Sequence, residues 1–265
     1  MTDPTDSFSE TFVATPQGRI YVRRWPAGAG EVGRAPIVLL HDSLGSVALW
    51  RDFPRQLALA TQRDVLAYDR LGFGASDAHP GVLGPGFVAE EAGQAFAAVH
   101  QALGLGDFVV LGHSVGGGMA AMVAALHGPR CRALITESAQ AFVEQRTLDG
   151  IRAAQRDFAG PGQLERLSRY HGDKAAWVLS AWIDTWLSPP FADYRLDETL
   201  QRVRCPVLAI HGECDEFGSL AHPERIRAQA AGPVQLQIVA GGGHVPHREQ
   251  PEAIVGRIAQ FLQAI

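Results

Sequence analysis

Hydrophobic and polar positions divide most of the chain into two kinds of segment that alternate. Short continuous apolar runs are typical of strands buried on both faces, and the segments after them space their apolar residues like amphipathic helices. The expected strands are 36–41, 64–69, 108–113, 133–138, 207–212 and 235–240, and the expected helices are 47–60, 87–103, 115–127, 223–231 and 252–262. This alternation predicts an α/β fold, with a mostly parallel sheet covered by helices on both faces.

The N-terminal part of the chain has a different pattern. Two strand-like runs, 11–14 and 20–24, flank the turn sequence Pro16-Gln17-Gly18 and predict a β-hairpin. The Gly/Ala-rich segment 27–33 is interpreted as a surface turn between strands.

One stretch, 140–198, is too long to be a simple connection between two strands and carries helical periodicity. Leu179, Trp182 and Trp186 fall on one face of a helix at this spacing. We therefore predict a helical cap at 140–198, inserted into a core formed by 1–139 and 199–265. Trp182 and Trp186 are candidates for a substrate pocket, with seating of the cap on the core as the alternative role.

Composition narrows the class of partner. The chain has 265 residues, 46% of them hydrophobic, a formal net charge of -5 and no Lys/Arg run. This argues against nucleic acid or an anionic membrane as the main partner and favours a small molecule. No apolar stretch is long enough for a membrane span, and the acidic, polar start MTDPTDSFSE favours a cytoplasmic protein. Nothing in the pattern indicates an oligomeric state.

The sequence Gly112-His113-Ser114-Val115-Gly116 follows an expected strand directly and opens an expected helix. A serine at such a sharp turn is held in a strained conformation with its hydroxyl above the sheet edge, and the flanking glycines avoid clashes. The N-terminus of the next helix directs backbone N–H groups at the same place. Ser114 is therefore a candidate nucleophile.

A serine hydroxyl needs a histidine base and an acid that orients it. His244 lies in a glycine-rich loop after the last expected strand, and Asp215 lies just past the strand 207–212. Other carboxylates compete with Asp215 for the role of the acid; they are Glu137, which follows the strand 133–138, Glu213 and Glu216.

Taken together, the motifs resemble those of lidded serine hydrolases of the α/β-hydrolase superfamily, over nearly the full length of the chain. The motifs that carry the resemblance are LLHDSLG (39–45), YDRLGFGASD (68–77), GHSVGG (112–117), HGECD (211–215) and GGGHVPHREQPE (241–252). The resemblance implies an eight-stranded sheet with a helical cap. It also implies Ser114 as nucleophile, His244 as general base and acid, and Asp215 as the group that orients His244.

The same resemblance implies an oxyanion hole built from two backbone N–H groups. One belongs to Val115, and we assign the other to Ser43. Members of the family usually have His-Gly where this chain has His41-Asp42, so Leu44 is the alternative donor.

Several other residues near these motifs are expected to have structural roles and not catalytic or metal-binding ones. His41 and His113 are expected to be structural, and Asp69 resembles a turn anchor of the family. His247 forms an H-x-x-H pattern with His244, but no third ligand lies nearby and Val245-Pro246 disfavours a helix between them, so no metal is expected.

No cofactor is expected either, because no P-loop or dinucleotide fingerprint is present. Three cap arginines are candidates for binding a substrate carboxylate, with a solvated helix face as the alternative; they are Arg146, Arg152 and Arg156.

These residues predict a serine hydrolase that cleaves a small ester-like substrate, namely a carboxylic ester, a lactone or a thioester. Two alternatives stay open. One is hydrolysis of a carbon–carbon bond in a ring-cleavage product with the same triad, and the other is a non-catalytic ligand-binding receptor of the same fold.

Overall fold

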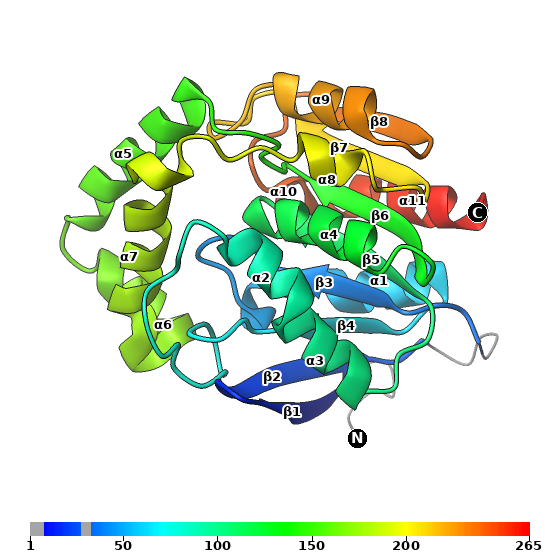
Figure 1. The fold of residues 1–265 in the computed structure, drawn as a ribbon, viewed down its shortest axis with the longest axis horizontal. Coiled ribbons are helices and arrows are strands. Elements are labelled where there is room, and N and C mark those ends of the chain that lie inside the picture. Colours follow the sequence, from blue (N-terminus) through cyan, green and yellow to red (C-terminus); the bar gives the residue numbers. More distant parts are fainter. Residues whose placement is uncertain (1–7, 28–32) are drawn as a thin grey trace.

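The computed structural model describes residues 8–27 and 33–265, which form an α/β fold with a mostly parallel sheet (Figure 1). Most of the predicted turn at 27–33 lies outside the described residues. The eight strands found there are β1 (Ser9–Thr15), β2 (Gly18–Trp25), β3 (Ile37–Leu40), β4 (Val65–Tyr68), β5 (Phe108–His113), β6 (Cys131–Glu137), β7 (Val207–Gly212) and β8 (Val234–Val239). The predicted fold class is confirmed.

The strand order is β1-β2-β4-β3-β5-β6-β7-β8. The predicted N-terminal hairpin is present, since β1 pairs antiparallel with β2, and β2 pairs antiparallel with β4. All remaining pairs are parallel. Because parallel strands end at one edge, the loops after β3, β5 and β7 meet there.

Successive residues of the central strands pack into opposite faces of the sheet. In β3, Val38 and Leu40 join the core under one helical layer, whereas Ile37 and Leu39 join the other. This is the period of two that a strand imposes on its side chains. It explains why these strands read as unbroken apolar runs in the sequence.

Helices cover both faces. The helices on one face are α2 (Phe87–Gly93), α3 (Ala95–Ala102), α4 (Val115–Leu126) and α9 (Ala221–Gln229), and those on the other are α1 (Phe53–Thr61) and α11 (Pro251–Gln263). The short helix α10 (Pro246–Glu249) precedes α11.

Two predicted helices are each divided. The expected helix 47–60 begins as the 3₁₀ helix η2 (Val47–Trp50) and restarts as α1, because Arg51 takes φ 52°. The expected helix 87–103 is broken into α2 and α3 at Gln94. Among the described residues, no helix has the length and apolar character needed to cross a membrane.

The cap lies between β6 and β7, beside the loop edge of the sheet (Figure 1). Its elements are α5 (Gln145–Phe158), α6 (Gln163–His171), η3 (Gly172–Lys174), α7 (Ala175–Trp186), η4 (Pro189–Phe191) and α8 (Asp197–Leu200). The boundary predicted at 198/199 falls inside α8, whose Asp197 pairs with Arg225 of α9 at 2.6 Å.

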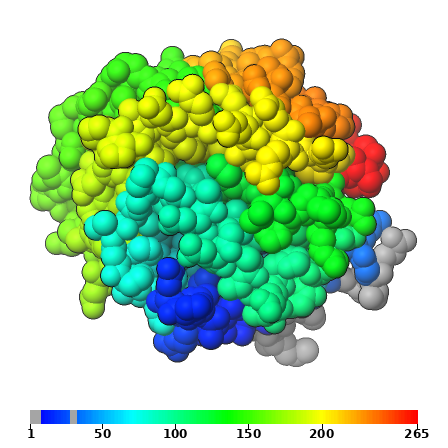
Figure 2. Space-filling model, in the orientation of Figure 1, coloured from blue at the N-terminus to red at the C-terminus, as the bar shows by residue number. Residues whose placement is uncertain are grey.

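The far end of the cap rests on a core loop. The Trp177 indole donates a hydrogen bond to the Gly81 carbonyl at 2.8 Å, and the Trp177 ring stacks on His79. In Figure 2 the green-to-yellow atoms of the cap accordingly lie against the cyan atoms of the core.

Candidate active site

Ser114 lies on the turn between β5 and α4. Its backbone has φ 56° and ψ −125°, a conformation that L-residues rarely adopt. A Cβ at Gly112 would stand 1.9 Å from the Gly116 carbonyl oxygen, and one at Gly116 would stand 2.2 Å from the Leu40 carbonyl oxygen. Both glycines are therefore required by close backbone packing, which aims the Ser114 hydroxyl at the loop edge of the sheet.

A continuous hydrogen-bonded chain joins the serine to a histidine and a carboxylate. His244 Nε2 lies 3.0 Å from Ser114 Oγ, and His244 Nδ1 lies 2.9 Å from each carboxylate oxygen of Asp215. The carboxylate accepts the Nδ1–H, which leaves Nε2 as the acceptor that faces the hydroxyl. The structure thus brings together the three side chains that the sequence singled out.

The Asp215 carboxylate is buried and held by further donors. Its Oδ1 accepts backbone N–H groups from Phe217 at 2.7 Å and from Gly218 at 3.1 Å. Burial alone would raise the pKa of Asp215, but the hydrogen bond and charge of His244, with the other donors, outweigh burial and lower this pKa. Asp215 is therefore ionised at neutral pH and can stabilise a His244 imidazolium.

Two of the three competing carboxylates, Glu137 and Glu213, have other partners. Glu137 accepts the Nδ1–H of His247 at 2.6 Å and the backbone N–H of His247 at 2.7 Å. Burial would raise the pKa of Glu137, yet the charge and hydrogen bonds of His247 lower it. Glu213 accepts the backbone N–H of Gly241 at 3.0 Å. His247, which pairs with Glu137, is thereby committed to a structural contact.

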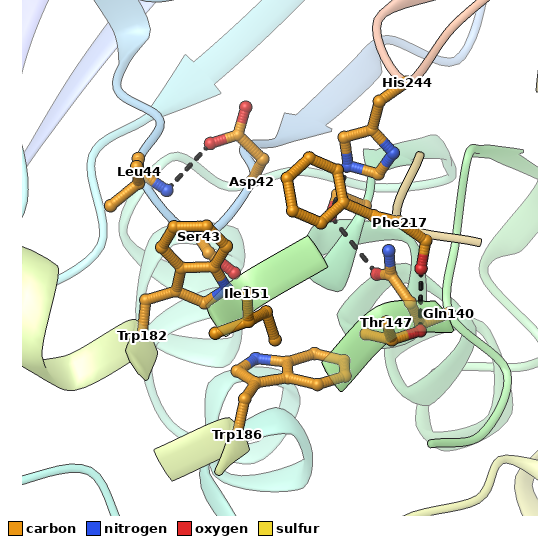
Figure 3. A pocket seen from close by; sticks show the side chains of 11 residues that line it. Asp42, Ser43, Leu44, Gln140, Thr147, Ile151, Trp182, Trp186, Phe217 and His244 are labelled. Atoms are coloured by element: carbon orange, nitrogen blue, oxygen red, sulfur yellow. Dashed lines mark hydrogen bonds between the residues drawn. The ribbon is translucent and has the colours of Figure 1, made fainter. Parts of the chain in front are cut away.

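The two candidates for the oxyanion hole differ in whether their N–H is free. The Leu44 N–H donates to Asp42 Oδ1 at 2.9 Å (Figure 3). The Ser43 N–H has no hydrogen-bond partner among the residues that the structure describes. Val115 is the first residue of α4, so its N–H has no partner within the helix. This arrangement favours Ser43 over Leu44 as the second donor.

Ser114 and His244 open onto a cavity of about 150 Å³ between core and cap. Figure 3 places Trp182 and Trp186 across this cavity from His244. Its lining residues are Asp42, Ser43, Leu44, Ser114, Gln140, Thr147, Ile151, Trp182, Trp186, Phe217 and His244. Both tryptophans therefore contribute to the cavity wall, while Trp186 also packs on Phe191 and Tyr194 in the cap.

Gln140 is a lining residue that the sequence analysis missed. Its Oε1 lies 3.2 Å from Ser114 Oγ, and its side chain is buried. It comes just after β6, whose end pairs with the end of β5, so its closeness to Ser114 follows from strand order. That order was not visible in the hydrophobic pattern alone.

Other singled-out residues hold the loops. Asp69 accepts N–H groups from Val47 and Ala75, at 2.6 and 2.7 Å, and so acts as a turn anchor. His41 Nε2 accepts the Arg70 N–H at 3.2 Å. His113 binds Asp42 and the backbone of His244.

The cap arginines do not line the cavity. Arg146 donates to the Asp215 carbonyl oxygen at 3.2 Å, and Arg152 pairs with Asp149 on the surface. Among the described residues, no three His, Cys, Asp or Glu side chains are placed to share a metal ion.

Known proteins share this architecture. The family described as alpha/beta hydrolase fold matches residues 35–192. Polyketide synthase ThaQ of Burkholderia thailandensis is 29% identical over 254 residues, which cover 87% of this chain but only 12% of the synthase.

Two solved structures align over nearly the whole chain. Proline iminopeptidase of Mycobacterium smegmatis has a TM-score of 0.73 at 22% identity, covering 97% of this chain and 98% of that one. Carboxylesterase CesB of Bacillus subtilis has a TM-score of 0.71 at 20% identity, covering 97% and 92%. These likenesses concern the fold, and the family match extends over more than half of the sequence. The chain belongs to the alpha/beta hydrolase fold family.

Proposed function

We propose that this protein is a serine hydrolase that cleaves a small, uncharged ester-like substrate, namely a carboxylic ester, a lactone or a thioester. The observation that carries the proposal is the hydrogen-bonded chain from Asp215 through His244 to Ser114 at the floor of the cavity. This is the arrangement that nucleophilic catalysis by serine requires.

In the proposed reaction, His244 Nε2 takes the proton of Ser114 as Oγ attacks the substrate carbonyl. The tetrahedral oxyanion accepts hydrogen bonds from the N–H groups of Ser43 and Val115. The imidazolium then protonates the leaving oxygen or sulfur, and the acyl group remains on Ser114. A water molecule, deprotonated by His244, releases the acid and restores the serine.

The lining of the cavity supports an uncharged substrate. Of the lining residues named above, none is Lys or Arg, and the carboxylate of Asp42 is among them. A substrate carboxylate near the reacting carbonyl would be buried with no Lys or Arg of the lining to pair with it. Ile151, Trp182 and Phe217 offer apolar surface to an acyl or alcohol group instead.

This lining also bears on carbon–carbon bond hydrolysis, the alternative within the same fold. A ring-cleavage product carries a dienol carboxylate, and the cap arginines that were candidates to bind it lie outside the cavity lining. The ester-like substrate is therefore the reading we favour.

Turnover of p-nitrophenyl acetate and p-nitrophenyl butyrate tests the proposal. We expect wild-type hydrolysis, and a loss of about 10⁴-fold or more in kcat for Ser114→Ala. Ser180→Ala, which removes an exposed cap hydroxyl, is the matched control and should hydrolyse like wild type. Turnover that survives Ser114→Ala unchanged would overturn the proposal. If the protein hydrolyses no ester, thioester or lactone, the alternative of a non-catalytic ligand-binding receptor of the same fold would be favoured.

A further inference from the structure

Asp42 occupies the position where members of the family usually have glycine, and its side chain contacts both catalytic loops. Asp42 Oδ1 accepts the Leu44 N–H at 2.9 Å within the oxyanion loop, and Oδ2 lies 3.2 Å from His113 Nδ1. Asp42 also lines the cavity beside Ser43 and Ser114. A carboxylate has thus been placed next to the proposed oxyanion hole.

His113 is buried between two hydrogen-bond acceptors. Its Nδ1 faces the Asp42 carboxylate, and its Nε2 lies 2.8 Å from the backbone carbonyl oxygen of His244. A carbonyl oxygen can only accept, so Nε2 must carry a proton. An ionised carboxylate also can only accept, so Nδ1 must carry one as well. With Asp42 ionised, this geometry therefore calls for an imidazolium.

The titratable groups around His113 act on its charge in opposite directions. The Glu137 carboxylate at the end of β6 favours a charged ring, whereas His244 and His247, whose rings lie 5.1 and 5.2 Å away, would oppose it when protonated. Burial would lower the pKa of His113, but the hydrogen bond and charge of Asp42, with the charge of Glu137, outweigh burial and raise it.

The same ion pair keeps Asp42 charged. Burial would raise the pKa of Asp42, but the hydrogen bond and charge of His113 outweigh burial and lower it, with smaller contributions from His41 and Arg248. Arg70 adds a hydrogen bond to the Asp42 carbonyl oxygen at 2.8 Å.

We propose that His113 is a positioning residue that works as an imidazolium: it neutralises Asp42 beside the oxyanion hole and ties the oxyanion loop to the loop of His244. An unpaired carboxylate there would oppose the negative charge that develops on the substrate oxygen. Loss of the His113 proton should therefore slow the reaction, whatever the ester. The catalytic part of this inference rests on the proposed function.

The protonation state can be measured without any substrate. In protein labelled with ¹⁵N-histidine, two-bond ¹H–¹⁵N correlation spectra should show both ring nitrogens of His113 protonated at pH 7. A His113→Gln sample assigns the signal. In Asp42→Asn, the introduced amide can donate to Nδ1, so the ring should become neutral at the same pH. One unprotonated nitrogen on His113 in wild type would overturn the proposal, even if no ester is ever hydrolysed.

The consequence for catalysis is a pH profile. In wild type, kcat/KM should fall at least about tenfold at alkaline pH, as His113 loses its proton. In Asp42→Asn this fall should disappear, since no carboxylate is left to neutralise. Asp149→Asn, which removes the surface partner of Arg152, is the control and should keep the wild-type profile. An equal fall in kcat/KM at alkaline pH in wild type and Asp42→Asn would contradict the positioning role of His113. A wild-type protein without Ser114-dependent turnover would contradict the proposed function instead.

Discussion

The core loops and the cap both line the cavity, but they fix their side chains by different means. On the core side, Ser114 is set by a strained turn between glycines that cannot carry a Cβ, and Asp215 is held by backbone N–H groups. On the cap side, Trp182 and Trp186 project from one face of an ordinary amphipathic helix. The core thus fixes the positions of the atoms that we propose to react, whereas the cap provides a surface.

Because of this difference, substitutions in the core loops and in the cap wall should have different effects on catalysis. A change in the core loops should alter the chemical step for every substrate, because the atoms it displaces are those of the triad and its supports. A change in the cap wall should alter which substrates are accepted, because that wall consists mainly of the apolar side chains of Ile151, Trp182 and Trp186, with Thr147 as its polar member. The predictions below test this division.

Among the changes that follow, the largest effect is expected for Asp215, the proposed acid of the triad. Asp215→Asn should lower kcat by about 10⁴-fold, because the amide cannot stabilise an imidazolium and favours the wrong His244 tautomer. Steady-state kinetics with p-nitrophenyl esters measure this loss. Glu137→Gln is the informative comparison, because Glu137 bonds to His247 and not to His244. If Glu137→Gln keeps its fold and loses more kcat than Asp215→Asn does, Glu137 and not Asp215 is the acid.

The next largest effect concerns the two tryptophans of the cap wall, which should differ in how much they contribute to stability and to substrate binding. Trp186→Ala should lower the free energy of unfolding by about 3–5 kcal/mol, since Trp186 is only 3% exposed and packs on Phe191 and Tyr194. Trp182→Ala should cost less stability, because Trp182 is half-buried, and should mainly raise KM for esters with larger acyl groups. Urea unfolding together with kinetics across acyl lengths distinguishes the two. Equal changes in kcat for all esters in Trp182→Ala would break the division between core and cap.

A smaller effect concerns the junction of cap and core. The Ala141 N–H donates to His222 Nδ1 at 3.1 Å, and His222 Nε2 lies 3.0 Å from Glu144 Oε1. Burial, partly offset by the charge of Glu144, lowers the pKa of His222 to about 4. From about pH 6.5 down to 4 the unfolded chain takes up this proton and the folded protein does not.

Stability should therefore fall with pH in that window, by at most about 1.4 kcal/mol per pH unit from this one group. Urea unfolding at several pH values should show a shallower slope for His222→Gln than for wild type. Ser180→Ala, which removes an exposed side chain without a titratable group, should keep the wild-type slope. An unchanged slope in His222→Gln would mean that His222 does not stay neutral in the folded protein.

The smallest effect is expected for Ser43→Ala. Ser43 is assigned through its backbone N–H, which Ser43→Ala retains, so loss of its hydroxyl should change kcat by no more than about twofold. The same ester assay measures this. A loss near the 10²- to 10³-fold typical of an oxyanion donor would mean that the side chain, and not the backbone, contacts the reacting oxygen.

The sequence predicted the parts of the molecule that depend on local pattern. The central strands were visible because burial on both faces requires unbroken apolar runs, and Ser114 stood out because its turn tolerates only glycine at 112 and 116. Asp215 and His244 could be placed because each directly follows a strand whose end faces the same edge.

What the sequence missed depends on contacts between distant segments. The place of Gln140 beside Ser114 follows from the pairing of β5 with β6, and the Asp42–His113 pair joins residues 71 positions apart. The break of the helix at Arg51 was also unforeseen, since nothing in apolar spacing reports a positive φ at an arginine. Such features need the strand order and the loop paths, which hydrophobic periodicity does not specify.

The central claim is that Ser114 is the nucleophile, and its most direct test is the site of covalent labelling. Wild-type protein should be treated with a fluorophosphonate, assayed for residual ester turnover, digested, and mapped by tandem mass spectrometry. We expect a single phosphonylated residue, Ser114, with turnover lost in proportion to labelling. A label on another residue, or full turnover in protein labelled completely at Ser114, would contradict the account.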